Sequence, residues 1–207
     1  DGSASLTISG PFGKIDAGDT SSALDAVDDV TDWGYELTTG TGNEDASLLW
    51  TLPAMMEGLT VNLSFSADST SADSSITAGN GYSFKYSFGD GDVRYGINDN
   101  EDDTEQTYVA ATYSMAGIGF AIEQFTTTTA AGVDTDNDAM ALTYTTGDLT
   151  LAIETLETAS AGTTSADITT LGAHYSMGGG LTAFIEQKDD EEDTTAETTA
   201  IGLAFSF

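Results

Sequence analysis

Cysteine is absent from this 207-residue chain, and basic residues are scarce: four Lys and Arg stand against 35 Asp and Glu. Without cysteine, neither a disulfide framework nor a thiolate metal site can form. The net charge of −31 excludes nucleic acid as a partner, because phosphate binding needs clustered Lys and Arg. No run of about 18 apolar residues occurs, so the sequence predicts no transmembrane helix.

Histidine occurs once, at position 174, which excludes a histidine metal cluster and a catalytic triad. Carboxylates are numerous enough for the acid pair of a glycosidase, but no pair stands out from the acidic background. We therefore expect that the protein is not an enzyme. Strand alternation instead places His174 among residues that face inward from a strand.

What the chain does contain is alternation of apolar with small or polar residues, repeated through roughly thirteen segments. In residues 82–88, for example, Tyr and Phe alternate with Ser and Lys. Short turns that contain Gly join these segments at one end. Longer polar and acidic loops join them at the other end, at about 68–80, 99–104, 126–138, 158–165 and 189–193.

This asymmetry between the two ends is typical of an all-β, antiparallel transmembrane β-barrel, with residues 1–207 forming one domain in the outer membrane of a Gram-negative cell. The positions of the basic residues support this interpretation, because all four fall on the polar face of their strands. On the lipid-facing side each Lys or Arg would cost about 2–4 kcal/mol at mid-bilayer. Aromatic residues recur near the short-turn ends, as an interfacial girdle would require: Tyr86, Phe88, Tyr113, Tyr144, Tyr175, Phe205 and Phe207.

The strand count carries a prediction of its own. The first strand runs into the turn at Gly10 and Pro11, and the last strand runs toward Phe207, so both point to the short-turn side. Two such strands are parallel and cannot close an all-antiparallel barrel, whose strand number is even in bacterial single chains. We therefore expect three further N-terminal strands and a 16-stranded barrel, a size that leaves an aqueous channel.

One long stretch, residues 19–47, does not alternate and carries eight acidic residues. Leu24, Val27 and Val30 are spaced three apart, which predicts a short helix over residues 22–30 with Ser21 or Ser22 as its cap. The stretch follows a short-turn hairpin and therefore leaves from the external ends of its strands. We interpret it as a loop that folds into the barrel and narrows the pore.

Two motifs resemble the general diffusion porins of alphaproteobacteria. Residues 6–19 (LTISGPFGKIDAGD) are similar to the family segment that precedes the constriction loop, and residues 201–207 (IGLAFSF) resemble the closing strand. The resemblance implies that Phe207 is the assembly signal and that residues 19–47 are the constriction loop. It also implies a homotrimer of 16-stranded barrels, embedded in outer-membrane lipid, that passes ions and small hydrophilic solutes by passive diffusion. The segment before the loop would be the fifth strand, which agrees with three missing strands.

The predicted constriction opposes carboxylates of the loop to basic residues of the wall. The loop side carries Asp25, Asp28, Asp29, Asp32 and Glu36, and the wall side carries Lys14, Lys85 and Arg94. Porins of this family usually place more Arg and Lys on that wall. Because a ring of carboxylates favours cations in a narrow aqueous pore, and acidic outer loops concentrate cations at its mouth, we expect a cation preference.

Two further possibilities are a calcium site and a secreted protein in place of a porin. Hard cations take several oxygen ligands, and Asp134, Asp136 and Asp138 offer them, although the spacing of an EF-hand is absent. No other cofactor is expected. The alternative function is a secreted, acidic, β-rich adhesin or surface-layer protein stabilised by Ca²⁺. Partition into detergent and a heat-dependent gel shift would favour the porin, whereas a soluble, strongly Ca²⁺-dependent protein would favour the adhesin.

Overall fold

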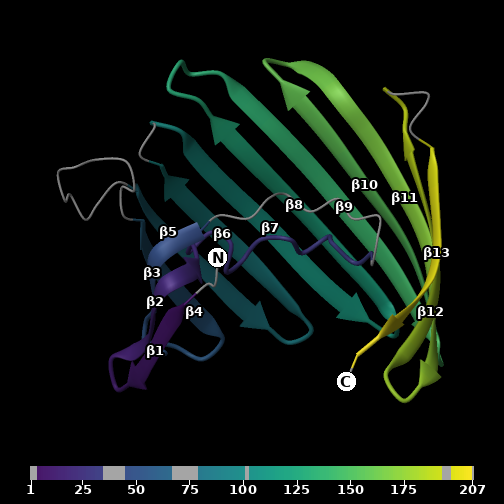
Figure 1. The fold of residues 1–207 in the computed structure, drawn as a ribbon, viewed down its shortest axis with the longest axis horizontal. Helices are drawn as coiled ribbons and strands as arrows, with labels where there is room; N and C mark the ends of the chain where they lie inside the picture. The colour runs from purple at the N-terminus through teal and green to yellow at the C-terminus, as the bar shows by residue number, and fades with distance from the viewer. Residues whose placement is uncertain (1–3, 35–44, 67–78, 101–102, 193–196, 207) are drawn as a thin grey trace.

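The structure is a computed structural model that describes residues 4–34, 45–66, 79–100, 103–192 and 197–206. Its strands form one curved antiparallel sheet in which sequence neighbours are also neighbours in space (Figure 1). The prediction of an all-β chain with about thirteen strands is confirmed. The strands are β1 (Ser5–Gly10), β2 (Gly13–Ser21), β3 (Asp45–Thr51), β4 (Leu59–Ser66), β5 (Gly79–Phe88), β6 (Gly91–Asp99), β7 (Glu105–Met115), β8 (Ile118–Thr128), β9 (Asp134–Thr146), β10 (Leu149–Ser160), β11 (Thr163–Gly178), β12 (Leu181–Asp190) and β13 (Thr198–Phe205).

Tight turns close the hairpins at one end of the sheet. Between β7 and β8, Ala116 and Gly117 both have positive φ, at 51° and 84°. A two-residue hairpin of this kind needs φ > 0 at both central positions, because only that geometry matches the twist of the flanking strands. The short-turn end therefore follows directly from the local sequence.

Two of the predicted loops are shorter than expected. Over residues 158–165 the structure has only a two-residue turn, Ala161 and Gly162, between β10 and β11. Over residues 126–138, β8 continues to Thr128 and β9 begins at Asp134. The Thr residues that suggested loops instead extend the strands, because β-branched side chains suit a pleated surface.

The predicted helix over residues 22–30 is wrong, since the structure has a single turn there. The N–H of Ala26 donates to the Ser22 carbonyl at 3.2 Å, and the N–H of Val27 donates to the Leu24 carbonyl at 2.9 Å. Asp29 then adopts φ = 53°, in the left-handed region, which a right-handed helix cannot contain. The spacing of the three apolar residues reflects a turn that packs against the sheet.

The distribution of apolar and polar side chains between the two faces of the sheet is the reverse of that in a water-soluble protein. Its convex face exposes large apolar side chains, including all the described residues of the predicted aromatic girdle. Its concave face carries the buried polar residues, listed in strand order as Asp16, Asn62, Ser64, Ser83, Asn98, Gln106, Glu123, Glu154, Thr170 and Glu186. Strand alternation places all four basic residues on this concave face as well. Apolar residues outside and polar residues inside are what lipid around the sheet and water within it would require.

The strands at the two ends of the sheet, β1 and β13, have one neighbour each, β2 and β12. Because neighbouring strands alternate in direction, the first and thirteenth strands are parallel to each other. Within the described ranges, no helix is long and apolar enough to cross a membrane.

Candidate functional site

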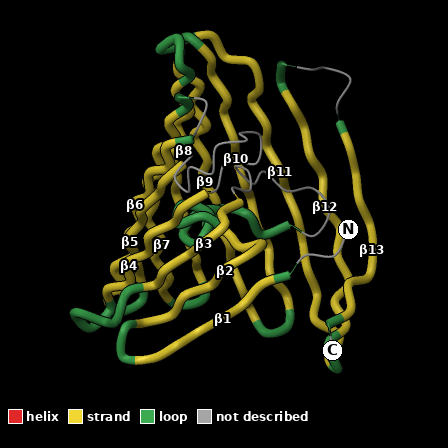
Figure 2. The backbone as a smooth tube through the Cα atoms, turned by 60° about the vertical axis from the view of Figure 1, so that its left-hand side comes forward, coloured by secondary structure: helices red, strands yellow, loops and turns green. Residues whose placement is uncertain are grey.

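Residues 22–34, here called the crossing segment, lie within the curve of the sheet (Figure 2). Leu24 and Val27 are buried in a cluster with Tyr108 and Ala110 of β7 and Phe125 of β8. The Ser22 hydroxyl accepts the N–H of Asp25 at 3.1 Å and so stabilises the start of the turn. Burial of an aliphatic side chain contributes about 1.5–3 kcal/mol, so this cluster fixes the first half of the crossing segment to the wall.

Glu123 of β8 holds the middle of the crossing segment. One of its oxygens accepts the N–H of Val30 at 2.9 Å and the hydroxyl of Tyr108 at 2.7 Å. The other oxygen accepts the hydroxyl of Thr31 at 2.7 Å. Both Glu123 and Thr31 are buried, and hydrogen bonds to an ionised group are about twice as strong as neutral ones.

Trp33 marks the far side of the crossing segment, where it meets β11. Its ring centroid lies 4.5 Å from that of His174, with the planes inclined by 39°. A Cβ at Gly172 would lie 2.0 Å from the Trp33 ring, so only glycine leaves room for the indole there. His174 Nε2 is 2.8 Å from a carboxylate oxygen of Glu186 on β12. The crossing segment therefore spans the concave face from β7 and β8 to β11.

The basic residues of the wall pair with wall carboxylates. Arg94 Nε lies 2.7 Å from Asp92, and Lys85 Nζ lies 3.4 Å from the same carboxylate. Lys14 pairs with Asp16 at 2.8 Å. Arg94 also reaches the crossing segment, where its Nη1 donates to the Val27 carbonyl at 2.9 Å. Arg94 thus contacts the backbone of the segment.

The predicted loop acids share the crossing segment but differ in environment. Asp28 is buried, and its Oδ2 has no hydrogen-bond partner within the described part of the chain. Burial, and then the nearby charges of Asp29, Asp25 and Glu123, raise the pKa of Asp28 to about 8. Loss of hydration and the charges of Asp29 and Glu123 also raise the pKa of the more exposed Asp32.

Asp25 and Asp29 are half-buried. Two other predicted residues, Glu36 and Phe207, lie outside the described residues.

The aspartates proposed for calcium lie at alternate positions of β9, on the convex face. Each accepts a hydrogen bond from β8: Asp134 from Thr128 at 2.8 Å, Asp136 from Thr126 at 2.7 Å and Asp138 from Gln124 at 2.9 Å. Alternate residues on a strand are about 7 Å apart, which is too far for three adjacent carboxylates to share one ion unaided. Among the described residues, no group of three His, Cys, Asp or Glu could hold a metal ion.

Several residues of the site were missed from the sequence. Glu123, Asp92 and Glu186 are acids at inward-facing strand positions, so strand parity could have identified them. Trp33 gave no such signal, since its partner Gly172 is 139 positions further along the chain and only the folded sheet brings them together.

The concave face is left with an excess of negative charge. Three of the four basic residues are paired with Asp16 or Asp92. Glu154 and Glu186 are fully buried on the same face, in addition to Glu123. The described part of the concave face therefore carries more carboxyl groups than basic side chains.

Comparison with known proteins agrees with this geometry. The sequence profile described as Gram-negative porin matches residues 1–195. The chain is similar to a porin refined at 1.8 Å, with a TM-score of 0.78 and 22% identity over 98% of this chain and 80% of that chain. It is also similar to OmpF of Salmonella typhi in complex with daunomycin (TM-score 0.75, 18% identity, 95% of this chain, 75% of that chain).

A third similar structure is the anion-selective porin from Comamonas acidovorans, with a TM-score of 0.72 and 14% identity over 99% of this chain and 73% of that chain. At these identities the likeness concerns the fold. No curated protein is significantly similar in sequence.

Proposed function

This chain belongs to the Gram-negative porin family of the outer membrane, and we propose that it is a non-enzymatic diffusion channel for ions and small hydrophilic solutes that favours cations. The observation that supports the preference is the charge imbalance of the concave face. Lys14, Lys85 and Arg94 lie within 3.4 Å of Asp16 or Asp92. The same face also carries the buried carboxyl groups of Glu123, Glu154 and Glu186, and the crossing segment adds four aspartates.

We assign the narrowing of the pore to the loop between β2 and β3, of which the structure describes residues 22–34. The predicted loop of residues 19–47 was too long at both ends, because residues 19–21 belong to β2 and residues 45–47 to β3. Support comes from the attachment of the crossing segment at three places: the Leu24 cluster, Glu123 and the Gly172 notch. A segment held in this way cannot lie flat along one strand. In this proposal Asp25, Asp29 and Asp32 supply carboxylates to the pore, and Asp28 adds a charge only when it ionises.

A homotrimer and a 16-stranded barrel remain proposals. The trimer is supported by the trimer form in which OmpT of Vibrio cholerae, a structure that this chain resembles, was determined. The larger barrel is supported by the parallel direction of β1 and β13 and by the 73–80% of the similar porins that this chain spans. An alphaproteobacterial origin and Phe207 as the assembly signal rest on the motifs at residues 6–19 and 201–207.

The reversal potential of single channels under a KCl gradient tests the proposal. We expect a cation-selective potential in planar bilayers at neutral pH. Neutralisation of the loop acids in Asp25→Asn, Asp29→Asn and Asp32→Asn together should reduce the preference. The matched control is Glu105→Gln, which removes a carboxylate from the exposed end of β7. Anion preference of the unaltered channel would contradict the proposal, and so would a triple variant that behaves like the control.

A further inference from the structure

A hollow lies between the crossing segment and the wall strands β7–β9, within the curve of the sheet. Val30, Thr31 and Trp33 line it from the crossing segment. On the wall side, Ser114 is one residue from the end of β7 and Thr143 is three residues from the end of β9, so the hollow lies toward the short-turn end. Its volume is about 180 Å³, the space of about six water molecules. We call it the segment pocket.

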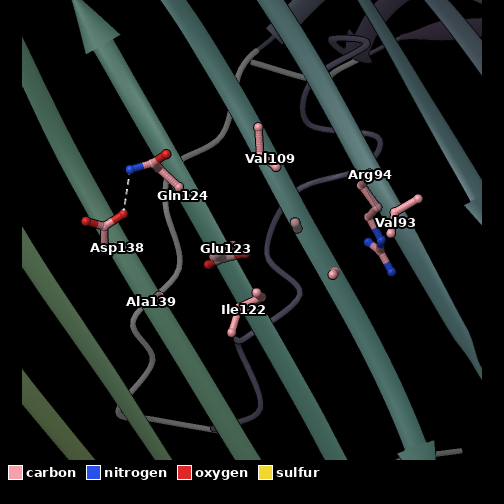
Figure 3. Close-up of a pocket in the computed structure, with 10 residues that line it drawn as sticks. Val93, Arg94, Val109, Ile122, Glu123, Gln124, Asp138 and Ala139 are labelled. Atoms are coloured by element: carbon pink, nitrogen blue, oxygen red, sulfur yellow. Dashed lines mark hydrogen bonds between the residues drawn. The ribbon is translucent and has the colours of Figure 1, made fainter.

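The segment pocket is uncharged, unlike the wall around it. None of the described residues that line it is acidic or basic. Arg94 of β6 and Glu123 of β8 (Figure 3) bind the backbone of the crossing segment and are not among the lining residues. An ion that entered the pocket would lose water without an opposite charge in contact, which is unfavourable. The pocket therefore suits a neutral ligand.

Hydroxyl groups line the segment pocket on the wall side. They belong to Thr112 and Ser114 of β7 and to Thr143 of β9. The Thr112 hydroxyl is hydrogen-bonded to the carboxylate of Asp92, which lies directly opposite on β6. Because a hydroxyl has one hydrogen and a carboxylate only accepts, the Thr112 oxygen is left as an acceptor for a ligand. A ligand that fits the pocket therefore brings hydrogen-bond donors of its own.

Trp33 presents carbon atoms to the segment pocket. Its Nε1 is buried, so the accessible part of the indole is apolar. The wall beside it includes the small residues Gly119, Ala121 and Ala141, which leave room for a ring. The face of an indole is electrostatically negative, so it attracts the weakly positive C–H groups of a ring that lies against it.

We propose that the segment pocket binds a neutral monosaccharide. A sugar ring has C–H groups on its faces and hydroxyls around its edge. The faces complement the carbon atoms of Trp33. The edge complements Thr112, Ser114 and Thr143, because sugar hydroxyls donate as well as accept. This inference rests on the proposed function, since the pocket holds the sugar within the pore, on the short-turn side of the crossing segment.

The fluorescence of Trp33 tests the site in the folded protein in detergent. Trp50→Phe leaves Trp33 as the only tryptophan, and Trp50 does not line the pocket. The probe is D-glucose, and we expect a saturable shift of the Trp33 emission. Tetraethylene glycol dimethyl ether is the informative comparison, because it accepts hydrogen bonds and has no donor. It should bind about tenfold more weakly than D-glucose, as the loss of one hydrogen bond would give.

Two variants in the same background locate the sugar. Ala141→Leu fills the pocket from β9 and should abolish the response to D-glucose. Thr143→Val keeps the shape of the side chain and removes its hydroxyl, so the dissociation constant should rise about two- to tenfold. The matched control is Thr150→Val, which removes a hydroxyl from the concave face of β10 outside the pocket and should leave the affinity unchanged. A heat-dependent gel shift shows that each variant is folded.

Four outcomes would overturn the proposal. The first is the absence of a saturable response to D-glucose, and the second is equal affinity for D-glucose and the ether. The third is a response that survives Ala141→Leu, which would place the sugar elsewhere. The fourth is affinity for D-glucosamine more than tenfold above that for D-glucose, which would assign the pocket to a cation.

Failure of this inference can be told apart from failure of the proposed function. A cation-selective channel whose Trp33 does not respond to D-glucose loses the monosaccharide site and keeps the channel function. A folded protein that forms no channel in planar bilayers, yet binds D-glucose in a manner sensitive to Ala141→Leu, keeps the site and loses the channel function.

Discussion

Trp33 packs against His174 with ring centroids 4.5 Å apart and planes inclined by 39°, beside a notch that exists because residue 172 is glycine. The contact joins the crossing segment to β11, on the far side of the concave face from its anchor on β7 and β8 (Figure 2). Since His174 is itself held by Glu186 at 2.8 Å, the indole packs against a side chain that has little freedom to move. The position of the crossing segment thus depends on residues of β11 and β12 that lie far from it in the sequence.

Gly172→Leu should expel the indole of Trp33 from its notch. Quenching of Trp33 by acrylamide should then increase, measured in a Trp50→Phe background that leaves Trp33 as the only tryptophan. Ala173→Leu is the matched control, because its side chain points to the convex face one residue further along the strand. Equal quenching in the two variants would show that the notch does not position Trp33.

Glu123→Ala should widen the constriction, because Val30, Thr31 and Tyr108 all lose their acceptor. Each hydrogen bond to a charged group contributes about 1.5–3 kcal/mol, so the middle of the segment should detach. Single-channel conductance and the largest permeating polyethylene glycol should both increase. Glu123→Gln retains one oxygen acceptor, so its conductance should lie between those of Glu123→Ala and the unaltered channel. A variant with the conductance of the unaltered channel would contradict the role of Glu123.

Leu24→Ala should loosen the first half of the crossing segment. Leu24 is fully buried, and truncation of a buried Leu typically costs about 2–5 kcal/mol. Amide hydrogen exchange should therefore accelerate in residues 22–31 and stay unchanged in β10 and β11. Leu151→Ala, on the convex face, serves as the control because Leu151 is exposed outside the cluster. Unchanged exchange in the segment would show that the cluster does not anchor it.

Cation preference should rise with pH in a step that belongs to Asp28. Its pKa is about 8 against an ordinary value of 3.8, so the carboxyl is neutral below pH 8 and charged above it. The reversal potential under a KCl gradient, measured from pH 6.5 to 9.5, should become more cation-selective through that range. Asp28→Asn should abolish the pH-dependent step. Asp25→Asn should lower the cation preference at every pH but keep the step. A step that survives in Asp28→Asn would assign the titration elsewhere.

The same shift makes a prediction about stability. Because the folded state holds the pKa of Asp28 above its unfolded value, ionisation opposes docking of the segment. The contribution of Asp28 to docking of the segment is most favourable below pH 3.8. It becomes less favourable as the pH rises from 3.8 to about 8. In Asp28→Asn, exchange protection of residues 22–31 should be higher than in the unaltered protein at pH 9 and at pH 6.5, and similar to it near pH 4.

Most of the fold could be predicted from the sequence because its signals are local. The period of two in residues 82–88 depends only on lipid on one side and water on the other. The turn at Ala116 and Gly117 is likewise decided by neighbouring residues. The predictions failed at residues 22–30 and 158–165, where local preferences were ambiguous. Thr is compatible with a strand or a loop, and a spacing of three fits a helix or a single packed turn.

The candidate site was less accessible from the sequence for a physical reason. The acids of the crossing segment were visible as a group, but their partners lie far along the chain. Glu123 is 92 residues from Thr31, and nothing local to either residue signals that they will meet. The pairing of Lys85 and Arg94 with Asp92 was also missed, because Asp92 was not recognised as an inward-facing acid on a strand face made mostly of small residues.

The anchorage of the crossing segment at both ends has a mechanical consequence. A segment attached at one end only would undergo large thermal motions, and the width of the pore beside it would fluctuate with them. A strip clamped on β7 and β8 and again at Gly172 behaves like a beam supported at both ends, whose displacements are small and fast. The open-state current should accordingly be quiet, and loss of the Gly172 clamp should appear first as excess current noise, before the mean current changes.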